Sequence, residues 1–267
     1  FMAMRPEREE PPCGDTFMAI RPEREETMKL LGLDSSGLVA SAAIVEDDIL
    51  LAEYTVNYKK THSQTLLPML DAIAGMMELD LETIDAIAVA AGPGSFTGLR
   101  IGSATAKGLG LALNKPLVAV PTVDALAFNL YDVPGLICPL MDARRNQVYT
   151  GLYEFRDHKM ETVAPQMAVG VEEIVEQINS LGREVIYLGD GVAVYRGQLE
   201  RLTRVPFSFA PLHLSRQRAG AVAALGAVYY ARGQVETAAE HRPEYLRMSQ
   251  AERERAEREA KKNHDNH

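Results

Sequence analysis

The sequence predicts a two-lobed α/β protein in which one order of elements occurs twice. Each half begins with closely spaced apolar runs, continues with a helical pattern, and then adds a buried strand and another helix. The first run of each half ends at an acid, Asp34 in one half and Asp142 in the other. A chain of 267 residues that is 46% apolar can form one or two globular domains with a substantial core.

The first half is expected to form three antiparallel strands, a helix, a buried strand and a second helix. Only short polar breaks separate the three strands, as in a meander. In the first helix, Leu66, Leu70, Ile73 and Met77 recur every three or four positions and share one face. The expected elements are strands 29–34, 38–45 and 49–56, a helix around 66–77, strand 84–92 and helix 98–113.

A strand at 117–120 and a helix from about 122 to 129 lead into the second half, where the same order restarts. This duplicated wiring is that of the ribonuclease-H-like (actin-like, ASKHA) two-lobed fold, in which each lobe is a mixed sheet with strand-strand-strand-helix-strand-helix order. The expected elements are strands 136–143, 147–155 and 158–164, helix 171–182, strand 184–191, a helix ending near 202, and a further helix over 219–232.

The domain division follows from these two halves. The segment FMAMRPEREE (1–10) returns as FMAIRPEREE (17–26), which is too short for a structural repeat. We interpret it as an extension outside the fold, whether a cloning scar, an upstream start or a native regulatory arm. The predicted domains are an N-terminal extension over 1–27, a first actin-like lobe over 28–128, a second over 129–246, and a charged C-terminal helix or tail over 247–267.

The turns after the first and fourth strands of each half are expected to face one another across a cleft, where ligands gather in strand-based folds. The most specific of them is AAGPGSFTGLR (90–100), whose glycines permit close backbone approach and whose N–H groups could hold a phosphate or carboxylate. A tight turn without a ligand is the alternative. The candidate nucleotide or anion residues are Asp34, Ser35, Ser36, Gly92, Gly94, Ser95, Thr97, Asp142, Arg144, Arg145, Gly189 and Asp190.

The helix after the glycine turn carries small residues four positions apart, at Gly98, Gly102, Ala106 and Gly110. Glycine costs ~1 kcal/mol in a helix interior, so four small residues in register indicate a packing demand. We interpret this face as a helix-to-helix dimer contact. Packing of the helix on its own sheet is the alternative. His62 opens the preceding helix and is interpreted as a cap or surface residue.

The overall composition of the chain argues against several classes of function. The net charge of −9 argues against strong nucleic-acid binding by the chain alone, because phosphate binding needs a basic surface. Two cysteines make no disulfide framework and favour a reducing cytoplasm. No apolar run reaches the ~18 residues of a membrane span, so no membrane association is expected.

Several segments together resemble the TsaB (YeaZ) family over residues 28 to about 252: MKLLGLDSS, HSQTLLP, AVAAGPGSFTGLRIG, PTVDALA, MDARRNQVY and PEYLRMSQAERE. The resemblance implies a scaffold that supports TsaD in making N6-threonylcarbamoyladenosine at adenosine 37 of tRNA, with the ATPase TsaE bound to the assembled pair. It implies homodimers, and heterodimers with TsaD, through helices near 62–77 and 98–113. The interface residues expected on this basis are His62, Leu66, Met69, Leu70, Gly98, Gly102, Ala106 and Gly110.

TsaD-like enzymes hold a metal with a His-x-x-x-His pair, and no two of the six histidines here lie four positions apart. At the corresponding place stand residues 121–125, PTVDA. We therefore expect no catalytic residue and no metal, and no cofactor required by this chain, with ATP or ADP and magnesium confined to the assembled complex. A small-molecule kinase or ATPase of the actin-like fold is the alternative function. A metallopeptidase is a third, less supported one.

Overall fold

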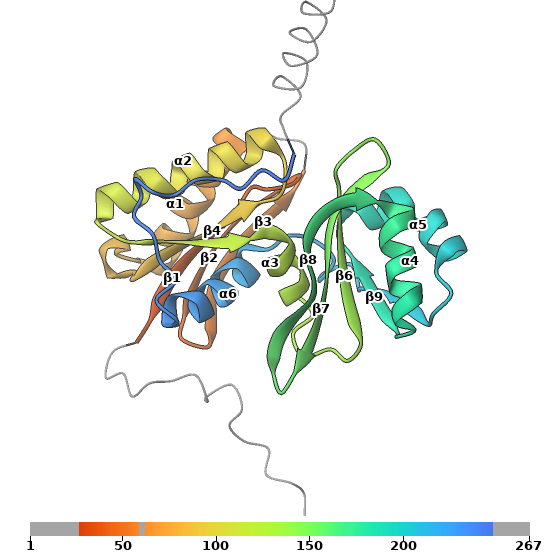
Figure 1. The fold of residues 1–267 in the computed structure, drawn as a ribbon. Helices are drawn as coiled ribbons and strands as arrows, with labels where there is room; N and C mark the ends of the chain where they lie inside the picture. Colours follow the sequence, from red (N-terminus) through yellow and green to blue (C-terminus); the bar gives the residue numbers. More distant parts are fainter. Residues whose placement is uncertain (1–26, 59–61, 248–267) are drawn as a thin grey trace, which may run out of the picture.

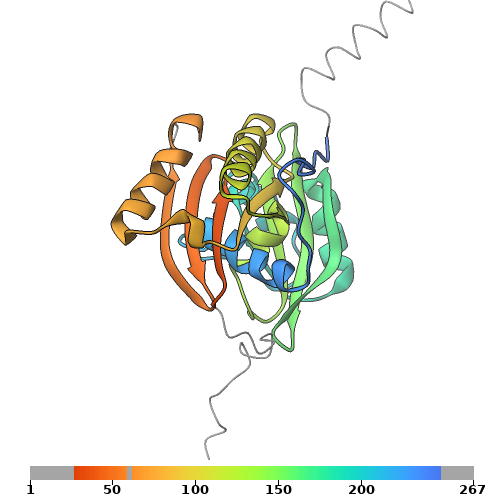
Figure 2. The same cartoon turned by 90° about the vertical axis from the view of Figure 1, so that its left-hand side faces the viewer.

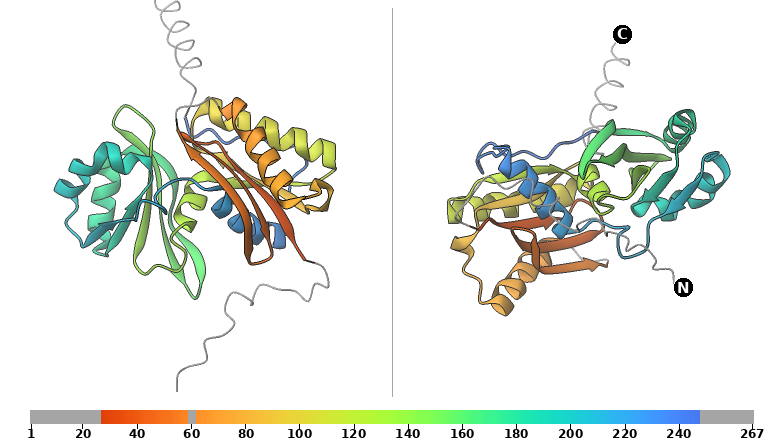
Figure 3. Two further views of the ribbon diagram at one scale, coloured as in Figure 1. Left: turned by 180° about the vertical axis from the view of Figure 1, so that it is seen from behind. Right: turned by 90° about the horizontal axis from the view of Figure 1, so that it is seen from below.

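Two sheets with flanking helices form two lobes that lie side by side (Figure 1 and Figure 3). The computed structural model describes residues 27–58 and 62–247. Nearly all of the N-terminal extension and the charged tail expected from the sequence therefore lie outside the described residues. Within the described part, each sheet has five strands, and the predicted duplicated α/β architecture is confirmed.

The first sheet joins an antiparallel meander to two parallel strands. Its central strands are buried on both faces, which explains why they are nearly continuous apolar runs rather than alternating ones. The glycine-rich turn follows directly from one of these central strands. The strands are β1 (Lys29–Asp34), β2 (Val39–Glu46), β3 (Ile49–Asn57), β4 (Ala86–Gly92) and β5 (Leu117–Pro121), in the spatial order β3-β2-β1-β4-β5.

Helices cover both faces of this sheet (Figure 2). Leu66, Leu70 and Ile73 pack one helix onto the sheet as the sequence spacing predicts. Ser95 caps the next helix, its Oγ accepting a hydrogen bond from the N–H of Gly98 at 3.3 Å. One face carries α1 (Leu66–Met77) and α2 (Phe96–Leu113), with short 3-10 turns at His62–Gln64 and Leu81–Thr83, and the other carries α3 (Thr122–Phe128) and α6 (Ala219–Ala231).

Helix α6 completes the first lobe although it follows the second lobe in the sequence. Its Val222 and Ala223 belong to the same buried cluster as Leu30 of β1. Gly32 of β1 admits this close approach, because a Cβ there would collide with the carbonyl oxygen of Ala219. The sequence prediction placed this helix within the second lobe. Its packing corrects that part of the domain division, since chain position does not decide which sheet an apolar helix covers.

The second sheet repeats the first, with β8-β7-β6-β9-β10 in the places of β3-β2-β1-β4-β5. Two helices cover its outer face. The strand over 207–209 is absent from the sequence prediction, because three residues leave too little pattern to detect. The elements are β6 (Leu136–Asp142), β7 (Gln147–Arg156), β8 (Lys159–Gly170), β9 (Val185–Leu188) and β10 (Phe207–Phe209), with α4 (Val171–Leu181) and α5 (Asp190–Leu202).

Helix α3 lies between the lobes and packs on both (Figure 1). Val123 and Leu126 join a buried cluster with Tyr153 of the second sheet, whereas Ala125 packs with the α6 side of the first sheet. A short helix that is buried on two sides thus holds the two sheets in a fixed relation.

Candidate functional site

The two predicted turns of the first lobe meet at the ends of β1 and β4. The N–H of Ser95 donates to the carbonyl of Ser36 at 2.6 Å, and Ser35 Oγ donates to the carbonyl of Gly98 at 2.8 Å. Gly94 must be a glycine, because an added Cβ would collide with the Ser36 carbonyl oxygen. The turns therefore satisfy one another, and the backbone contact explains the glycines of this motif without a bound ligand.

Asp34 is the most electrostatically perturbed acid of this group. It is 1% exposed, and its Oδ1 accepts hydrogen bonds from the N–H of Ser36 at 2.8 Å and from Ser36 Oγ at 2.7 Å. Burial raises the pKa of Asp34 from 3.8 to about 6, against smaller lowering effects of the Ser36 bonds and of nearby His62. His62 joins the same turn, with its Nε2 2.9 Å from the carbonyl oxygen of Gly37.

The two acids of the second lobe, Asp142 and Asp190, also meet, at the ends of β6 and β9. Asp190 Oδ1 accepts a hydrogen bond from the N–H of Asp142 at 3.2 Å, and Tyr195 donates to Asp142 Oδ1 at 3.1 Å. Burial raises the pKa of Asp190, with a lowering contribution from the Asp142 N–H bond. Gly189, at φ 105°, packs on the carbonyl of Leu140 and turns the chain into α5. Each acid therefore closes a turn of its own lobe.

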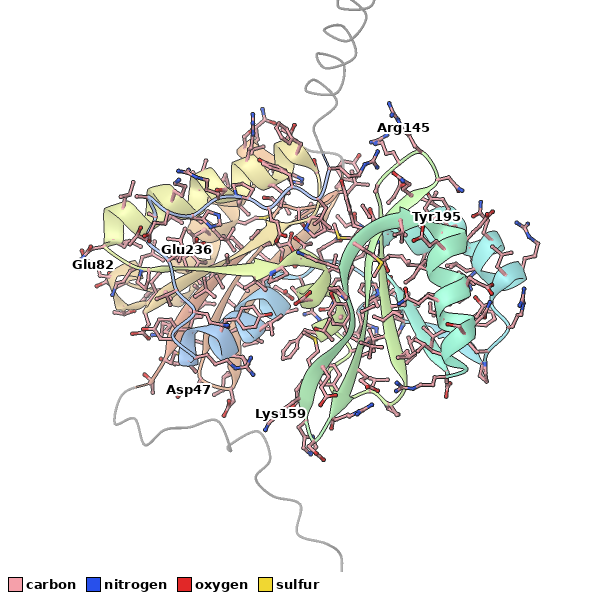
Figure 4. All side chains as sticks on the ribbon, in the orientation of Figure 1. Asp47, Glu82, Arg145, Lys159, Tyr195 and Glu236 are labelled. Atoms are coloured by element: carbon pink, nitrogen blue, oxygen red, sulfur yellow. The ribbon has the colours of Figure 1, made fainter. Side chains whose placement is uncertain are left out.

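The two arginines of the candidate cleft lie in the turn between β6 and β7. Arg144, Arg145 and Asn146 are three successive exposed residues in the left-handed region, with φ of 62°, 55° and 59°. Such a conformation costs non-glycine residues roughly 1–2 kcal/mol each. Arg145 extends outward from the tip of the turn (Figure 4). The strained turn thus presents guanidinium groups outward, where they could contact another molecule.

Residues 241–247 run from the first lobe to the second, next to the glycine turn. The N–H of Glu244 donates to the carbonyl of Ala91 at 2.7 Å. The ring of Tyr245 lies 4.7 Å, centroid to centroid, from that of Phe96 at the start of α2. Residues 243–247 belong to PEYLRMSQAERE, one of the segments that carry the family resemblance, but their composition gives no periodic signal for contacts with residues about 150 positions earlier.

The same segment reaches the second lobe. Arg247 Nη1 donates to the carbonyl of Ala143 at 2.7 Å, and Gln166 Nε2 donates to Glu244 Oε2 at 3.0 Å. Gly92 leaves room for this crossing, because an added Cβ there would collide with the Glu244 carbonyl oxygen. The segment thus occupies part of the space between the candidate turns.

The small-residue face of α2 points inward, which corrects the predicted dimer contact. Gly98, Gly102, Ala106 and Gly110 are all buried against the chain's own structure. A Cβ on Gly98 would collide with the carbonyl oxygen of Ser35. The four-residue spacing shows that a face is bare but cannot show which neighbour covers it. Here the neighbour is the first sheet and its turns.

The apolar residues that we expected at the interface on α1 are buried as well. Leu66, Met69 and Leu70 are at most 4% exposed and belong to the core of the first lobe. His62 is partly exposed. The prediction that these three residues contact another chain is therefore wrong, because the first sheet already covers their face of the helix.

The opposite faces of the same two helices are open. On α2, Ala104, Gly108 and Ala112 are exposed and again lie four positions apart. A Cβ added to Gly108, or to Gly75 of α1, would meet nothing within 4 Å. Large apolar side chains flank these small ones: Leu67 is 52%, Met76 87% and Leu111 70% exposed. This outer row is visible in the sequence, but the inner row, which lies two positions earlier along the helix, has the same four-residue spacing and was interpreted instead.

Helix α3 stands where the resemblance places the paired histidines of TsaD-like enzymes. Thr122 Oγ1 accepts a hydrogen bond from the N–H of Gly92 at 3.1 Å, and Val123 and Leu126 are buried. Asp124 accepts hydrogen bonds from Tyr153 at 2.6 Å and from Tyr229 at 3.4 Å. Within residues 27–58 and 62–247 no three His, Cys, Asp or Glu side chains are grouped so that they could hold a metal ion.

Two lobes that repeat one sheet order around a shared helix place the chain in the class of two-lobed α/β proteins of the actin-like type. A family model described as TsaD, tRNA N6-adenosine threonylcarbamoyltransferase, matches residues 50–255. The Bacillus subtilis protein TsaB is 33% identical over 227 residues, which are 84% of this chain and 96% of that protein. The chain belongs to the TsaB (YeaZ) family.

Further relatives agree with this placement. Escherichia coli TsaB is 31% identical over 167 residues, which cover 61% of this chain and 72% of that protein. Two Pseudomonas aeruginosa structures cover 82% of this chain and all of their own. YeaZ has a TM-score of 0.70 at 27% identity, and an uncharacterized protein with similarity to peptidase YeaZ has a TM-score of 0.72 at 28%. In the described part of this chain, no helix combines the length and apolarity that crossing a bilayer requires.

Proposed function

We propose that this chain is a non-catalytic subunit that takes part in threonylcarbamoyladenosine synthesis on tRNA by binding a TsaD-type transferase. The names of its relatives and the TsaD description of the matching family model support this role. The observation that carries the binding part is the exposed small-residue row on α2, at Ala104, Gly108 and Ala112. Its place of action would be the cytoplasm, where an unpaired buried thiol such as that of Cys138 stays reduced.

Nothing in residues 27–58 and 62–247 explains the exposed row. Gly108 and Gly75 lie inside helices, where each costs ~1 kcal/mol relative to alanine, and neither makes room for an atom of the described part of the chain. Small residues let a second helix approach closely, and the neighbouring Met76 and Leu111 would be removed from water by such an approach. A partner helix packed across α1 and α2 would account for both features.

The same face would serve two partners in turn. A second copy of the chain could pack on α1 and α2 when the chain is alone, and a TsaD-type subunit could replace it. An ATPase such as TsaE would then contact the assembled pair. The net charge of −9 supports a division of labour in which the other subunits recognise tRNA, because phosphate binding needs a basic surface.

Two features favour the role of a non-catalytic subunit over that of an enzyme. The side chains of α3 are committed to packing and to the hydrogen bonds of Asp124 with two tyrosines. The acids at the candidate cleft, Asp34, Asp142 and Asp190, each accept a hydrogen bond from a backbone N–H of their own lobe.

A test replaces exposed residues of the outer face and leaves the inner face intact. Gly108→Arg and Met76→Glu should each weaken copurification with TsaD at least tenfold, because a long or charged side chain would hold the two surfaces apart. Val194→Glu is the matched control, since Val194 is 59% exposed on α5 of the other lobe. Thermal unfolding of all three variants checks that the fold is retained.

Reconstitution of the tRNA modification distinguishes the two parts of the proposal. If both outer-face variants still copurify with TsaD at the level of the unmodified chain, the assigned face is wrong. If TsaD and TsaE modify tRNA equally well without this chain, its supporting role is wrong. Metal analysis of the purified chain adds an independent check, because a tightly bound stoichiometric ion would contradict the non-catalytic assignment.

A further inference from the structure

A pocket of about 640 Å³ opens between the lobes, away from α1 and α2. One wall is formed by the β2–β3 turn and α6 of the first lobe, and the other by the start of β8 in the second. Asp47 and Lys159, which belong to its lining, lie at the same lower edge of the molecule, one on each lobe (Figure 4). Whatever fills this pocket therefore contacts both lobes at once.

The interior of the pocket is apolar, and its edge is charged. Leu50 (45% exposed), Phe128, Met160 and Val228 supply apolar surface from four different elements. Charged side chains of both signs line the edge: Asp47, Asp48 and Arg232, which follows α6, on the first lobe, and Lys159 on the second, next to His158. A short apolar peptide flanked by both arginine and glutamate residues matches this pattern.

The chain itself enters the fold at this pocket. Thr27 and Met28, the first described residues, belong to the pocket lining. Met28 is fixed there by two bonds to Asp47: its N–H donates to Asp47 Oδ1 at 3.0 Å, and its carbonyl accepts from the Asp47 N–H at 2.8 Å. The residues that precede Thr27 consequently start from the mouth of the pocket.

We propose that the pocket binds residues 17–20 of the same chain, Phe-Met-Ala-Ile. Ile20 lies seven residues before Thr27, a distance that an extended chain spans at roughly 3.3–3.6 Å per residue. Arg21 and Arg24 follow the apolar tetrapeptide and complement the acids of the β2–β3 turn, and Glu23 and Glu25 complement Lys159 and Arg232. The docked segment ties the two lobes together. This inference does not depend on the proposed function.

The duplicated sequence supplies an internal competitor. Phe-Met-Ala-Met at residues 1–4 has nearly the same side chains but ends 23 residues before Thr27. Effective concentration falls roughly as the −3/2 power of tether length, which favours the nearer copy about sixfold. The two copies therefore form a matched pair in which mainly the tether differs.

Photo-crosslinking in the full-length chain tests the assignment. With p-benzoylphenylalanine in place of Phe17, crosslinks should form to Met28, Met160 and residues 224–228, and mass spectrometry locates them. The same group in place of Phe1 should give these crosslinks about sixfold less often. Mixing isotopically light and heavy chains separates crosslinks within one chain from those between chains. Pocket crosslinks that are absent, or that form only between chains, would overturn the proposal.

A pocket variant provides a second, independent readout. Leu50→Asp should reduce the protection of the amides of residues 17–20 from hydrogen exchange at least tenfold, because it places a charge on the apolar wall. Val194→Asp, on the outer surface of the second lobe, should leave that protection unchanged. Equal exchange in the unmodified chain and the Leu50 variant would contradict docking, provided that both variants unfold at similar temperatures.

Discussion

Two glycines of one helix illustrate how a residue's surroundings decide its contribution. Gly98 faces the carbonyl oxygen of Ser35 and has no room for a side chain, whereas Gly108 faces open space. Both lie within α2, so the intrinsic helix penalty is similar for each. The first is required by packing inside the lobe, whereas no described residue of the chain requires the second.

The same substitution at the two positions should therefore have opposite effects. Gly98→Ala should lower the free energy of unfolding by about 1–3 kcal/mol, the usual cost of overpacking. Gly108→Ala should raise it by about 0.5–1 kcal/mol, because alanine is the better helix former. Urea unfolding of the two variants measures both values. A stabilised Gly98 variant would show that the turns around Ser35 are not packed as described.

The ionisation of Asp34 makes the stability of the fold depend on pH. Its folded pKa of about 6 lies above the ordinary 3.8, so the folded state holds this proton more tightly than the unfolded state does. Its contribution to stability is therefore complete below about pH 4 and is lost as the pH rises through 6. At about 1.4 kcal/mol per pKa unit, the loss is about 3 kcal/mol.

Asp34→Asn removes this titration while keeping an oxygen for the Ser36 hydrogen bonds. Relative to the unmodified chain, the variant should gain about 3 kcal/mol of stability between pH 4 and pH 7. Chemical unfolding at pH 4, 5, 6 and 7 gives the difference directly. Glu200→Gln, at an exposed position, serves as the control. A stability difference that is constant across this range would refute the raised pKa.

At the scale of elements, α6 is held to the first sheet by polar as well as apolar contacts. Glu53 of β3 lies at the first turn of α6, where its Oε1 accepts from the N–H of Gly220 at 2.9 Å. Its Oε2 accepts from Arg218 Nε at 3.0 Å. A carboxylate at a helix N-terminus complements the partial positive charge of the free N–H groups. The acid therefore fixes where α6 begins on the sheet.

Glu53→Ala should destabilise the chain by about 2 kcal/mol, because it leaves Arg218 and a helix N–H without their acceptor in a largely buried place. Glu200→Ala removes an exposed pair with Arg196, and we expect it to cost less than about 0.5 kcal/mol. Thermal unfolding compares the two. Equal costs would mean that the Glu53 network adds nothing beyond an ordinary surface pair.

Elements with strong periodicity could be predicted from the sequence, and their surroundings could not. The buried runs that became β1 and β4, and the spacing of Leu66, Leu70 and Ile73 in α1, depend on local pattern alone. The inner face of α2 was assigned to a partner because spacing does not reveal which surface a bare stripe meets. Helix α6 was assigned to the wrong lobe for the same reason.

The candidate site shows the same division between local and distant information. The turns containing Asp34 and Asp142 were correctly expected at strand ends, since a strand pattern determines where its turn begins. The backbone N–H groups that close each turn can be identified only in the folded structure. The position of residues 241–247 in the fold could not be predicted, because a segment without periodicity gains its place only through contacts that are distant in sequence.

For the whole molecule, the crossing segment bears on nucleotide binding. Glu244 and Arg247 join the first lobe to the second beside the candidate phosphate turns. We therefore expect the isolated chain to bind magnesium-ATP more weakly than 1 mM (about −4 kcal/mol) in calorimetry. A double variant, Glu244→Ala with Arg247→Ala, should bind no less tightly. Submillimolar binding with turnover by the unmodified chain would instead support the kinase or ATPase alternative.

The return of α6 to the first sheet has a consequence for biosynthesis. A ribosome makes Leu30 near the beginning of the chain but Val222 and Ala223, which cover it, only after the entire second lobe. The nascent first sheet therefore waits with an uncovered apolar face while the later lobe, whose strands and outer helices are contiguous over 136–209, can already close. Synthesis from the N-terminus thus allows the second lobe to close before the first, in the reverse of their order along the chain.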